Sequence, residues 1–371
     1  MTKKILFLTP FIPGQLTGGQ IFTNNLLMDL REESRDVLID VICYCNSTEL
    51  YKEGHFRRKD IILRPITHTR KIWNSVKIAP IFYAFSNRFS VKELMILLKT
   101  MRRTRYDLIV LDHSQLFIYG LFIRRVPKIA ISHDVITQRI HRQGNYLKYL
   151  HSRITESILI RLLRDTRFYT FSKKDKLYLK NLGANEVFTT SFYPNFTVSD
   201  YPSLENAIVL FASWSRPENI EGLRWFVESV LPFIRLDIQV KVLGGGLPNK
   251  DIDRLKTHSN VKYLGFVDDP AVSIASSMLL IAPIFQGAGV KVKVVDALSL
   301  GTPVLGTKMA FEGINFELKG AMQQAKTKKE FINRINSCEV DLSFKYKLKE
   351  EFWRKYFNYN LRNDILNYVE R

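Results

Sequence analysis

A glycine-rich segment in the last third of the chain, GAGVKVKVVDALSLGTPV, combines residue types that suit the binding of an anion. Gly287 and Gly289 allow backbone N–H groups to approach an anion closely, while Lys291 and Lys293 supply full positive charges. A helix that begins here would add the positive end of its dipole. Asp296 follows one turn later, where a carboxylate could accept hydrogen bonds from ribose hydroxyls. This order of residues suits the diphosphate of a sugar nucleotide.

The same segment is also compatible with a buried strand, because Val290, Val292 and Val294 alternate with lysines. Its surroundings favour the anion site. Met278–Phe285 is a continuous apolar run typical of a buried parallel strand, and Gly301–Pro303 would end a helix before the next strand. The sequence therefore predicts a strand, a glycine turn and a helix, which is the order that a phosphate site requires.

His133 is the candidate for chemistry in the first half of the chain. It follows the apolar strand KIAIS, and open α/β sheets bind ligands at the carboxyl ends of their strands. Asp134 could orient His133 or act as a base toward an acceptor hydroxyl. His113, one predicted strand away, is a weaker candidate. The alternative interpretation of His133 is a core histidine with satisfied hydrogen bonds.

Alternating strands and helices in both halves predict an α/β protein with two successive βαβ sheets. We expect strands at residues 5–9, 37–43, 61–64, 108–111, 128–132, 168–171, 187–189, 208–211, 240–243, 261–264, 279–282 and 304–306. We expect helices at residues 20–31, 90–103, 117–124, 146–163, 173–181, 219–231, 250–255 and 271–275. The turn-rich stretch Tyr193–Leu204 separates the two halves, and we place the boundary between residues 198 and 199.

Length and composition exclude several classes of protein. The chain has 371 residues and 46% apolar content, which is enough for two domains with separate cores. Its longest apolar runs are too short to span a bilayer, and the apolar N-terminus reads as a first strand and not as a signal peptide. The three cysteines lack metal-binding spacing, so we expect a reducing, cytoplasmic setting.

The positive charge is concentrated in the first half. Residues 1–200 carry 32 Lys and Arg against 17 Asp and Glu, whereas residues 201–371 carry 23 against 19. Within the first half, Lys52–Arg105 holds 14 basic and 3 acidic residues interleaved with aromatic side chains. This predicts an anionic partner, with a solvated surface as the alternative. An anionic membrane surface or acceptor fits better than nucleic acid, because no nucleic-acid-binding module is recognisable.

Eight short motifs lie along the chain in a specific order. They are Leu8-Thr9-Pro10 with Gly18-Gly19, Asp107-Leu-Ile-Val with His113, Ser132-His133-Asp134, Phe171-Ser172-Lys173, Tyr193-Pro194-Asn195, Trp214-Ser-Arg216-Pro217-Glu-Asn219, Leu264-Gly265-Phe266-Val267, and the glycine-rich segment itself. On these motifs the chain resembles the GT-B glycosyltransferases, glycosyltransferase family 4 in particular, over nearly its full length. The resemblance implies two Rossmann-like, doubly wound parallel-sheet domains that face each other across a cleft.

The resemblance also assigns a role to each domain. Residues 1–198 would bind the acceptor, and a C-terminal helix at residues 352–371 would cross back to this domain. Residues 199–351 would bind the nucleotide-sugar donor.

The family implies roles for particular residues as well. Lys291 and Lys293 match a basic pair that grips the donor diphosphate, and His133 would hydrogen-bond the donor sugar. The remaining donor-binding positions are Gly287, Ala288, Gly289 and Val290 as backbone donors, Phe266 and Val267 beside the base, and Gly18 and Gly19 facing the diphosphate from the other domain.

Two departures from the family pattern change the expected site. The family usually has two glutamates eight positions apart, and here Ala288 and Asp296 occupy those places. A second basic pair is absent, because Ser213 and Glu221 stand at the positions that we would align with it. Arg216 could compensate, but Lys291 and Lys293 must then neutralise most of the diphosphate charge, and no metal is required.

The sequence thus predicts a glycosyltransferase that moves a sugar from a nucleotide-diphosphate sugar to a glycan or lipid-linked acceptor. We expect retention, no metal and no cofactor besides the donor, with His133, Asp134 and Lys293 as catalytic residues. We expect a role in surface polysaccharide or glycoconjugate synthesis, at the inner face of the cell membrane as a peripheral protein. Two alternatives are a non-catalytic GT-B partner protein and a GT-B sugar-nucleotide epimerase.

Overall fold

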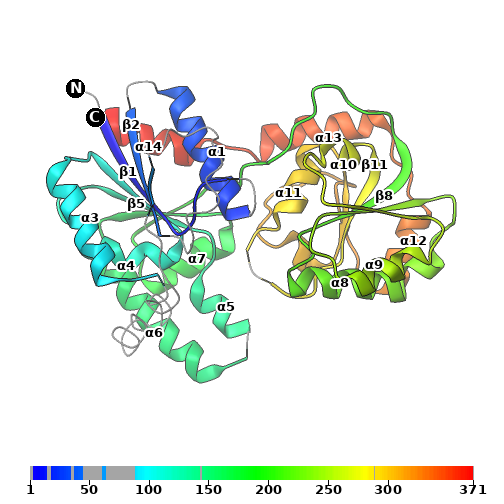
Figure 1. The fold of residues 1–371 in the computed structure, drawn as a ribbon, viewed down its shortest axis with the longest axis horizontal. Coiled ribbons are helices and arrows are strands. Elements are labelled where there is room, and N and C mark those ends of the chain that lie inside the picture. Colours follow the sequence, from blue (N-terminus) through cyan, green and yellow to red (C-terminus); the bar gives the residue numbers. More distant parts are fainter. Residues whose placement is uncertain are drawn as a thin grey trace. The chain divides into compact units, whose positions relative to one another are not determined.

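The computed structural model describes residues 3–14, 18–34, 37–44, 61–63, 88–142, 144–287 and 289–370. The chain divides into two compact units (Figure 1). The first unit comprises Met1–Tyr193 together with Tyr359–Arg371, and the second comprises Pro194–Asn358. Most of the basic window at residues 52–105, including Trp73, lies outside the described residues.

The first unit is built on a seven-stranded parallel sheet with the order β3-β2-β1-β4-β5-β6-β7. The strands are β1 (Lys3–Thr9), β2 (Val37–Cys43), β3 (Ile61–Leu63), β4 (Leu108–Asp112), β5 (Lys128–Ser132), β6 (Thr166–Thr170) and β7 (Glu186–Thr189). The helices are α1 (Gly18–Glu33), α3 (Val91–Arg103), α4 (Phe117–Gly120), α5 (Ile136–Arg142), α6 (Tyr146–Leu162), α7 (Lys173–Leu182) and α14 (Asn360–Glu370), with a 3-10 turn at Ser114–Leu116.

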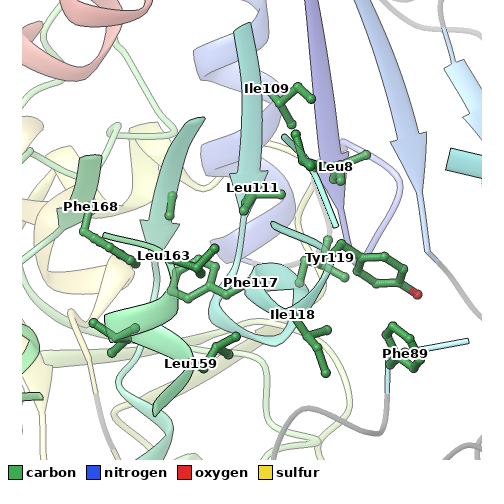
Figure 2. Packing of buried hydrophobic residues seen from close by; sticks show 14 of the residues in the cluster. Leu8, Phe89, Ile109, Leu111, Phe117, Ile118, Tyr119, Leu159, Leu163 and Phe168 are labelled. Atoms are coloured by element: carbon green, nitrogen blue, oxygen red, sulfur yellow. The ribbon is translucent and has the colours of Figure 1, made fainter. Parts of the chain in front are cut away.

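Continuous apolar strands place this sheet in the middle of the first unit. All five residues of β4 are buried, as expected for a parallel strand covered on both faces. Figure 2 shows part of the core: Ile109 of β4 lies beside Leu8 of β1, Leu111 of β4 lies near Phe117, and Leu159 and Leu163 from the α6 region belong to the same cluster. The helix packing is therefore driven by apolar burial on the sheet.

The second unit is a six-stranded parallel sheet with the order β10-β9-β8-β11-β12-β13. The strands are β8 (Glu205–Phe211), β9 (Gln239–Leu243), β10 (Val261–Gly265), β11 (Ser277–Ala282), β12 (Val304–Gly306) and β13 (Met322–Gln324). The helices are α8 (Pro217–Ser229), α9 (Asn249–Lys256), α10 (Ala271–Ala275), α11 (Val292–Ser299), α12 (Lys328–Asn336) and α13 (Leu342–Lys355), with 3-10 turns at Leu231–Phe233 and Lys308–Phe311.

The predicted architecture of two successive parallel sheets is confirmed. The ambiguous valine–lysine alternation forms a helix, α11, and not a strand. The helix expected at residues 117–124 is shorter and ends at Gly120. Helix α5 and strand β13 were not predicted, because each is only a few residues long and has weak periodicity. Helix α12 and most of α13 were also not predicted.

The prediction of one helix over residues 352–371 was wrong. Helix α13 ends at Lys355, and α14 starts at Asn360. The break between them contains Asn358, and asparagine is unfavourable inside helices. Tertiary contacts then fix α14 to the first unit, where it packs against α1 and β1. Arg362 of α14 donates to Asp29 and pairs with Glu33, both of which belong to α1.

A glycine in α8 sets how closely this helix approaches the sheet. A Cβ added at Gly222 would lie 2.1 Å from the carbonyl oxygen of Pro283, just beyond β11. We predict that Gly222→Ala destabilises the second unit by about 2–4 kcal/mol, because the backbone must move despite the better helix propensity of alanine. Thermal or urea unfolding measures this loss. Gly144→Ala is the control, since no atom lies within 4 Å of its added Cβ and only the positive φ of 76° opposes it; equal effects of the two changes would contradict the packing argument.

Candidate active site

The second unit has its topological switch point between β8 and β11. From β8 the chain moves outward through β9 and β10, and β11 returns to the other side of β8 before β12 and β13 continue in the opposite direction. The loops after β8 and β11 therefore diverge at the carboxyl ends of neighbouring strands, where open α/β sheets bind ligands.

Glycines allow the loops at this edge to meet backbone to backbone. A Cβ added at Gly244, after β9, would lie 1.8 Å from the carbonyl oxygen of Ala212, after β8. A Cβ at Gly246 would lie 3.0 Å from the backbone nitrogen of Ser215. Both glycines have positive φ, so only glycine satisfies the conformation and the spacing together. This packing fixes the entry of the chain into α8.

The predicted glycine turn lies after β11 as expected. Gly287 and Gly289 have φ values of 119° and 72°, in the region that favours glycine. Lys291 is the N-cap residue of α11, and its side chain makes no capping hydrogen bond. Its ammonium instead donates to the carbonyl oxygen of Gly289 at 2.7 Å. The first turn of α11 and the Lys291 ammonium therefore lie at one place, and Ala288 of this loop is outside the described residues.

Lys293 is the electrostatic centre of this site. Its Nζ donates to Oδ1 of Asn219 at 2.9 Å, and the amide of Asn219 in turn donates to the carbonyl oxygen of Ser213 at 2.8 Å. Lys293 as a whole is half-buried. The pKa of Lys293 is lowered to about 7, mainly by burial and to a lesser extent by the charges of Lys291 and Arg216, against an opposing effect of Glu218.

The three predicted cations, Lys291, Lys293 and Arg216, therefore lie close enough to influence one another electrostatically. Arg216 is the N-cap residue of α8, with Pro217 opening the helix, so the N-termini of α8 and α11 both belong to this cluster. Three positive side chains and one carboxylate leave an excess of positive charge, to which two helix dipoles add. The arrangement suits an anion with more than one negative charge.

Asp296 lies in the core and does not face solvent. It is 1% exposed, and its two carboxylate oxygens accept hydrogen bonds from the backbone N–H and the side-chain amide of Asn195, at 2.9 and 3.0 Å. Burial raises the pKa of Asp296 to about 7, and the two hydrogen bonds from Asn195 oppose that rise. The contact seen in the structure is thus with the chain at the start of the second unit, and the ribose role of Asp296 stays a prediction.

Phe266 and Val267 follow β10, the edge strand two positions from β8. Phe266 is 73% exposed, and its Cβ lies 3.5 Å from the position of an added Cβ at Gly245. Val267 is half-buried. An exposed aromatic ring beside a glycine loop offers a flat apolar surface at the same edge of the sheet, which suits stacking with a base. That role is untested and stays a prediction.

The first unit has its own switch point, between β1 and β4, and the predicted histidines lie beside it. His113 follows β4 with a φ of 84°, a conformation uncommon outside glycine. His133 follows β5. The two imidazole rings stack with centroids 5.2 Å apart, and the Phe11 ring meets His113 edge-on at 6.2 Å.

Asp112, not Asp134, orients His133. Nε2 of His133 lies 2.7 Å from Oδ1 of Asp112, the last residue of β4, which is fully buried. The other carboxylate oxygen accepts from the hydroxyl of Thr23. Asp134 follows His133 in the chain, and its backbone carbonyl accepts from Ser114 at 2.7 Å. Orientation of His133 by Asp134 is therefore corrected, while a role of Asp134 as base stays a prediction.

The predicted glycine pair reaches this histidine through Thr23. Gly18 and Gly19 form the start of α1, and the Thr23 hydroxyl, which has a single hydrogen to donate, lies within hydrogen-bond distance of both the Gly19 carbonyl, at 3.0 Å, and Asp112. A Cβ at Gly19 would lie 2.8 Å from Cζ of Phe11, which requires a residue without a side chain there. Asp112 was missed in the sequence, although an acid at the end of an apolar strand is the same signal that identified His133.

No cluster of three or more His, Cys, Asp or Glu side chains with metal-ligand geometry occurs within the described ranges. Asp251, whose spacing from Asp253 resembles a metal-binding pair, accepts two hydrogen bonds from the Arg224 guanidinium, each at 2.8 Å. Its carboxylate thus links α9 to α8. Asp251 is therefore part of a structural ion pair.

Comparisons with known proteins agree with this geometry. Residues 205–339 match the family model described as Glycosyl transferases group 1, and no curated protein matches the chain significantly. Sucrose-phosphate synthase from Thermosynechococcus elongatus is 13% identical, with a TM-score of 0.70 over 100% of this chain and 98% of that chain. A TarM variant from S. aureus is 12% identical, with a TM-score of 0.70 over 100% of both chains. HepE from Anabaena is 16% identical, with a TM-score of 0.63 over 99% of both.

At these identities the solved structures show the fold alone, and that fold is GT-B. The family match covers less than half of the chain and lies within the second unit, which is therefore similar to glycosyl transferases group 1. The chain therefore has the GT-B fold, and its resemblance to glycosyl transferases group 1 lies in the unit with the cationic switch-point site.

The Asp112–His133 contact gives a test of the site in the first unit. We predict that Asp112→Asn lowers the transfer rate about 10–100-fold, because an amide no longer fixes the ring orientation and tautomer of His133. Steady-state kinetics should show a loss in kcat, while nucleotide binding measured by calorimetry stays unchanged. Asp107→Asn is a matched control, since Asp107 accepts from the backbone of Lys4 in the same unit, away from His133. An unchanged kcat in Asp112→Asn would show that the orientation of His133 by Asp112 does not contribute to catalysis.

Proposed function

We propose that this protein is a glycosyltransferase that moves a sugar from a nucleotide-diphosphate sugar to a glycan or lipid-linked acceptor, with the donor bound by the second unit. The observation that carries the proposal is the gathering of Lys291, Lys293 and Arg216 at the N-termini of two helices. A nucleoside diphosphate has the required charge, and Phe266 at the same sheet edge offers a surface for its base.

Lys293 would make the strongest single contribution to donor binding. A diphosphate places about two negative charges in a partly desolvated site, where each charge-assisted hydrogen bond is worth about 1.5–3 kcal/mol. In the free protein the Lys293 ammonium has a neutral amide as its hydrogen-bond partner, and two cations oppose its charge. An anion that reaches this ammonium removes an existing electrostatic penalty in addition to making a new bond.

Solved structures with the same fold support the choice of donor. HepE from Anabaena has been solved with UDP and with UDP-glucose, and the TarM variant with UDP and α-GlcNAc-glycerol. A uridine diphosphate sugar is therefore the first donor to test. The first unit would hold the acceptor, with His133 placed by Asp112 to hydrogen-bond the transferred sugar.

We propose retention of the anomeric configuration without a metal. In this mechanism the departing phosphate accepts the proton of the acceptor hydroxyl on the same face of the sugar. The protein then contributes positioning and stabilisation of the leaving diphosphate, which the cations and helix termini would supply. Lys293 would carry the largest share of that stabilisation.

We propose that the enzyme works in surface polysaccharide or glycoconjugate synthesis, as a peripheral protein at the cytoplasmic face of the cell membrane. The excess of basic residues in residues 1–200 would favour an anionic membrane surface. No helix in the part of the chain that the structure describes is long and apolar enough to cross a membrane.

Removal of the Lys293 charge tests the donor site. We predict that Lys293→Ala weakens binding of UDP at least about tenfold and abolishes transfer, because one charge-assisted contact is lost. Calorimetry with UDP measures the affinity, and product analysis with chelator present measures transfer and anomeric configuration. Lys256→Ala, an exposed lysine of α9 in the same unit, is the control.

Unchanged affinity of Lys293→Ala for UDP would refute the donor-site assignment. Retained binding without transfer to any acceptor would favour a non-catalytic partner protein. Conversion of the donor in the absence of an acceptor would favour an epimerase.

The lowered pKa of Lys293 predicts a proton linkage. Its pKa lies at about 7 in the free protein against an ordinary 10.5, so burial penalises the protonated form. The free protein should therefore gain stability as pH rises from 7 toward 10.5. Binding of the diphosphate has the opposite sign, because it requires the ammonium and raises its pKa.

We accordingly predict that the enzyme takes up protons when it binds a nucleotide sugar at pH 8, and that its affinity falls from pH 7 to 9. Calorimetry in two buffers with different ionisation enthalpies measures the uptake. Lys293→Arg should bind without this uptake, because a guanidinium stays charged at all these pH values. Equal proton uptake by Lys293→Arg would assign the linkage to another group.

A further inference from the structure

Helix α6 has apolar side chains on two opposite faces. Its inner face packs into the first unit, where Leu159 lies with Leu163 and Phe117 in the core (Figure 2). Its outer face carries five aliphatic residues that are between 42% and 79% exposed: Leu147, Leu150, Ile154, Ile158 and Leu162. We call these five residues the α6 stripe.

The spacing of the α6 stripe makes it one continuous surface. Successive members are three or four residues apart, so they follow one side of the helix over about 22 Å at 1.5 Å per residue. Isolated exposed leucines are normal on protein surfaces, whereas a helix-long apolar row is typical of a surface that binds something. The row runs from Leu147 to Leu162, nearly the whole length of α6.

The charges beside the α6 stripe indicate the partner. Lys148, Arg153 and Arg161 are exposed on this helix. Glu156 is the one acidic residue of α6, and it is 2% exposed on the inner face. The solvent side of α6 therefore combines aliphatic residues with positive charge alone, which is the pattern of helices that lie in a membrane interface.

A second copy of this chain is a poorer partner for the α6 stripe. A symmetric contact between two α6 helices would bring the exposed cations of both copies together, which costs free energy. Anionic lipid headgroups would neutralise the same cations, and the acyl region would cover the aliphatic side chains. The positive charge beside the α6 stripe therefore favours an anionic lipid surface over a second copy of the chain as the partner.

We propose that α6 lies in the interface of an anionic membrane with the α6 stripe inserted among the lipids. This inference rests on the proposed function, which places the enzyme at an anionic membrane without naming the surface that binds. The inference names the surface that binds, and it depends on apolar insertion as well as on charge.

A hydrogen bond connects α6 to the start of α5, which directly follows the loop with His133 and Asp134. The backbone N–H of Thr137, in the first turn of α5, donates to the Glu156 carboxylate at 2.9 Å, and the Thr137 hydroxyl donates to the same oxygen. Thr137 lies three residues after Asp134 in the chain. A membrane that holds α6 would therefore hold the end of β5 at a fixed depth, where a lipid-linked acceptor would present its hydroxyl to His133.

Flotation of the full-length protein with lipid vesicles tests the proposal. Vesicles of phosphatidylcholine mixed with phosphatidylglycerol are compared with vesicles of phosphatidylcholine alone. We predict that the triple variant Leu150→Ser, Ile154→Ser, Ile158→Ser lowers partition to the anionic vesicles at least about tenfold, because three inserted aliphatic side chains are lost. Thermal unfolding should be unchanged, since all three side chains are exposed.

The control is the triple variant Phe233→Ser, Leu236→Ser, Val272→Ser, which removes exposed apolar residues from the second unit. It should bind vesicles as the unchanged protein does. Ile154→Trp adds a direct measurement: brominated lipids should quench its fluorescence beyond the quenching of the four natural tryptophans.

Two results would overturn the proposal. The first is that the α6 triple variant floats with anionic vesicles as well as the unchanged protein does, and that brominated lipids do not quench the added tryptophan of Ile154→Trp. The second is a dimer of the unchanged protein, seen by light scattering, that the α6 variant converts to a monomer, because the stripe would then bind a second copy. UDP affinity and transfer to a soluble acceptor are measured on the same variants, and they should be unchanged. If the proposed function is wrong, the UDP and transfer measurements fail for the unchanged protein as well, whereas the vesicle-binding result still tests the α6 stripe.

Discussion

The ammonium of Lys293 sets the main physical constraint on the second unit. Lys293 is half-buried, and its hydrogen-bond partner is the neutral amide of Asn219. The nearby Lys291 and Arg216 oppose its charge, whereas Glu218 favours it. Burial of a cation with so little compensating negative charge is unfavourable, which is why the pKa falls to about 7. Such an arrangement is preorganised for an anion, because a bound anion would relieve the electrostatic penalty that the free protein carries.

The parallel sheet makes that arrangement possible. Chain reversal between β8 and β11 opens two loops side by side, and each loop leads into the N-terminus of a helix. Glycines at 222 and 244 permit contacts that any side chain would prevent, so the loops are fixed by backbone packing. Asn219 is likewise held by the Ser213 carbonyl. The cations are therefore placed by rigid elements, which is what electrostatic stabilisation of a leaving group requires.

Sequence patterns predicted the elements well and the partners of individual residues less well. The two sheets, the glycine turn and the position of His133 follow from local signals: apolar strands, positive-φ glycines and the residue after a strand. The Asp112–His133 pair joins residues from neighbouring strands, and strand order is a tertiary property. The break between α13 and α14 has the same origin, because Arg362 finds Asp29 only once the C-terminus has returned to the first unit.

Helix α11 shows how one element can serve two opposite electrostatic roles. Lys293 and Asp296 are three residues apart on this helix, and burial moves both pKa values to about 7, downward for the lysine and upward for the acid. The lysine belongs to the cationic cluster, whereas the acid binds Asn195, the second residue of the unit. A shift of α11 on anion binding would have to stretch the bonds to Asn195. The proposed donor site and the start of the second unit would therefore be linked through a single turn of helix.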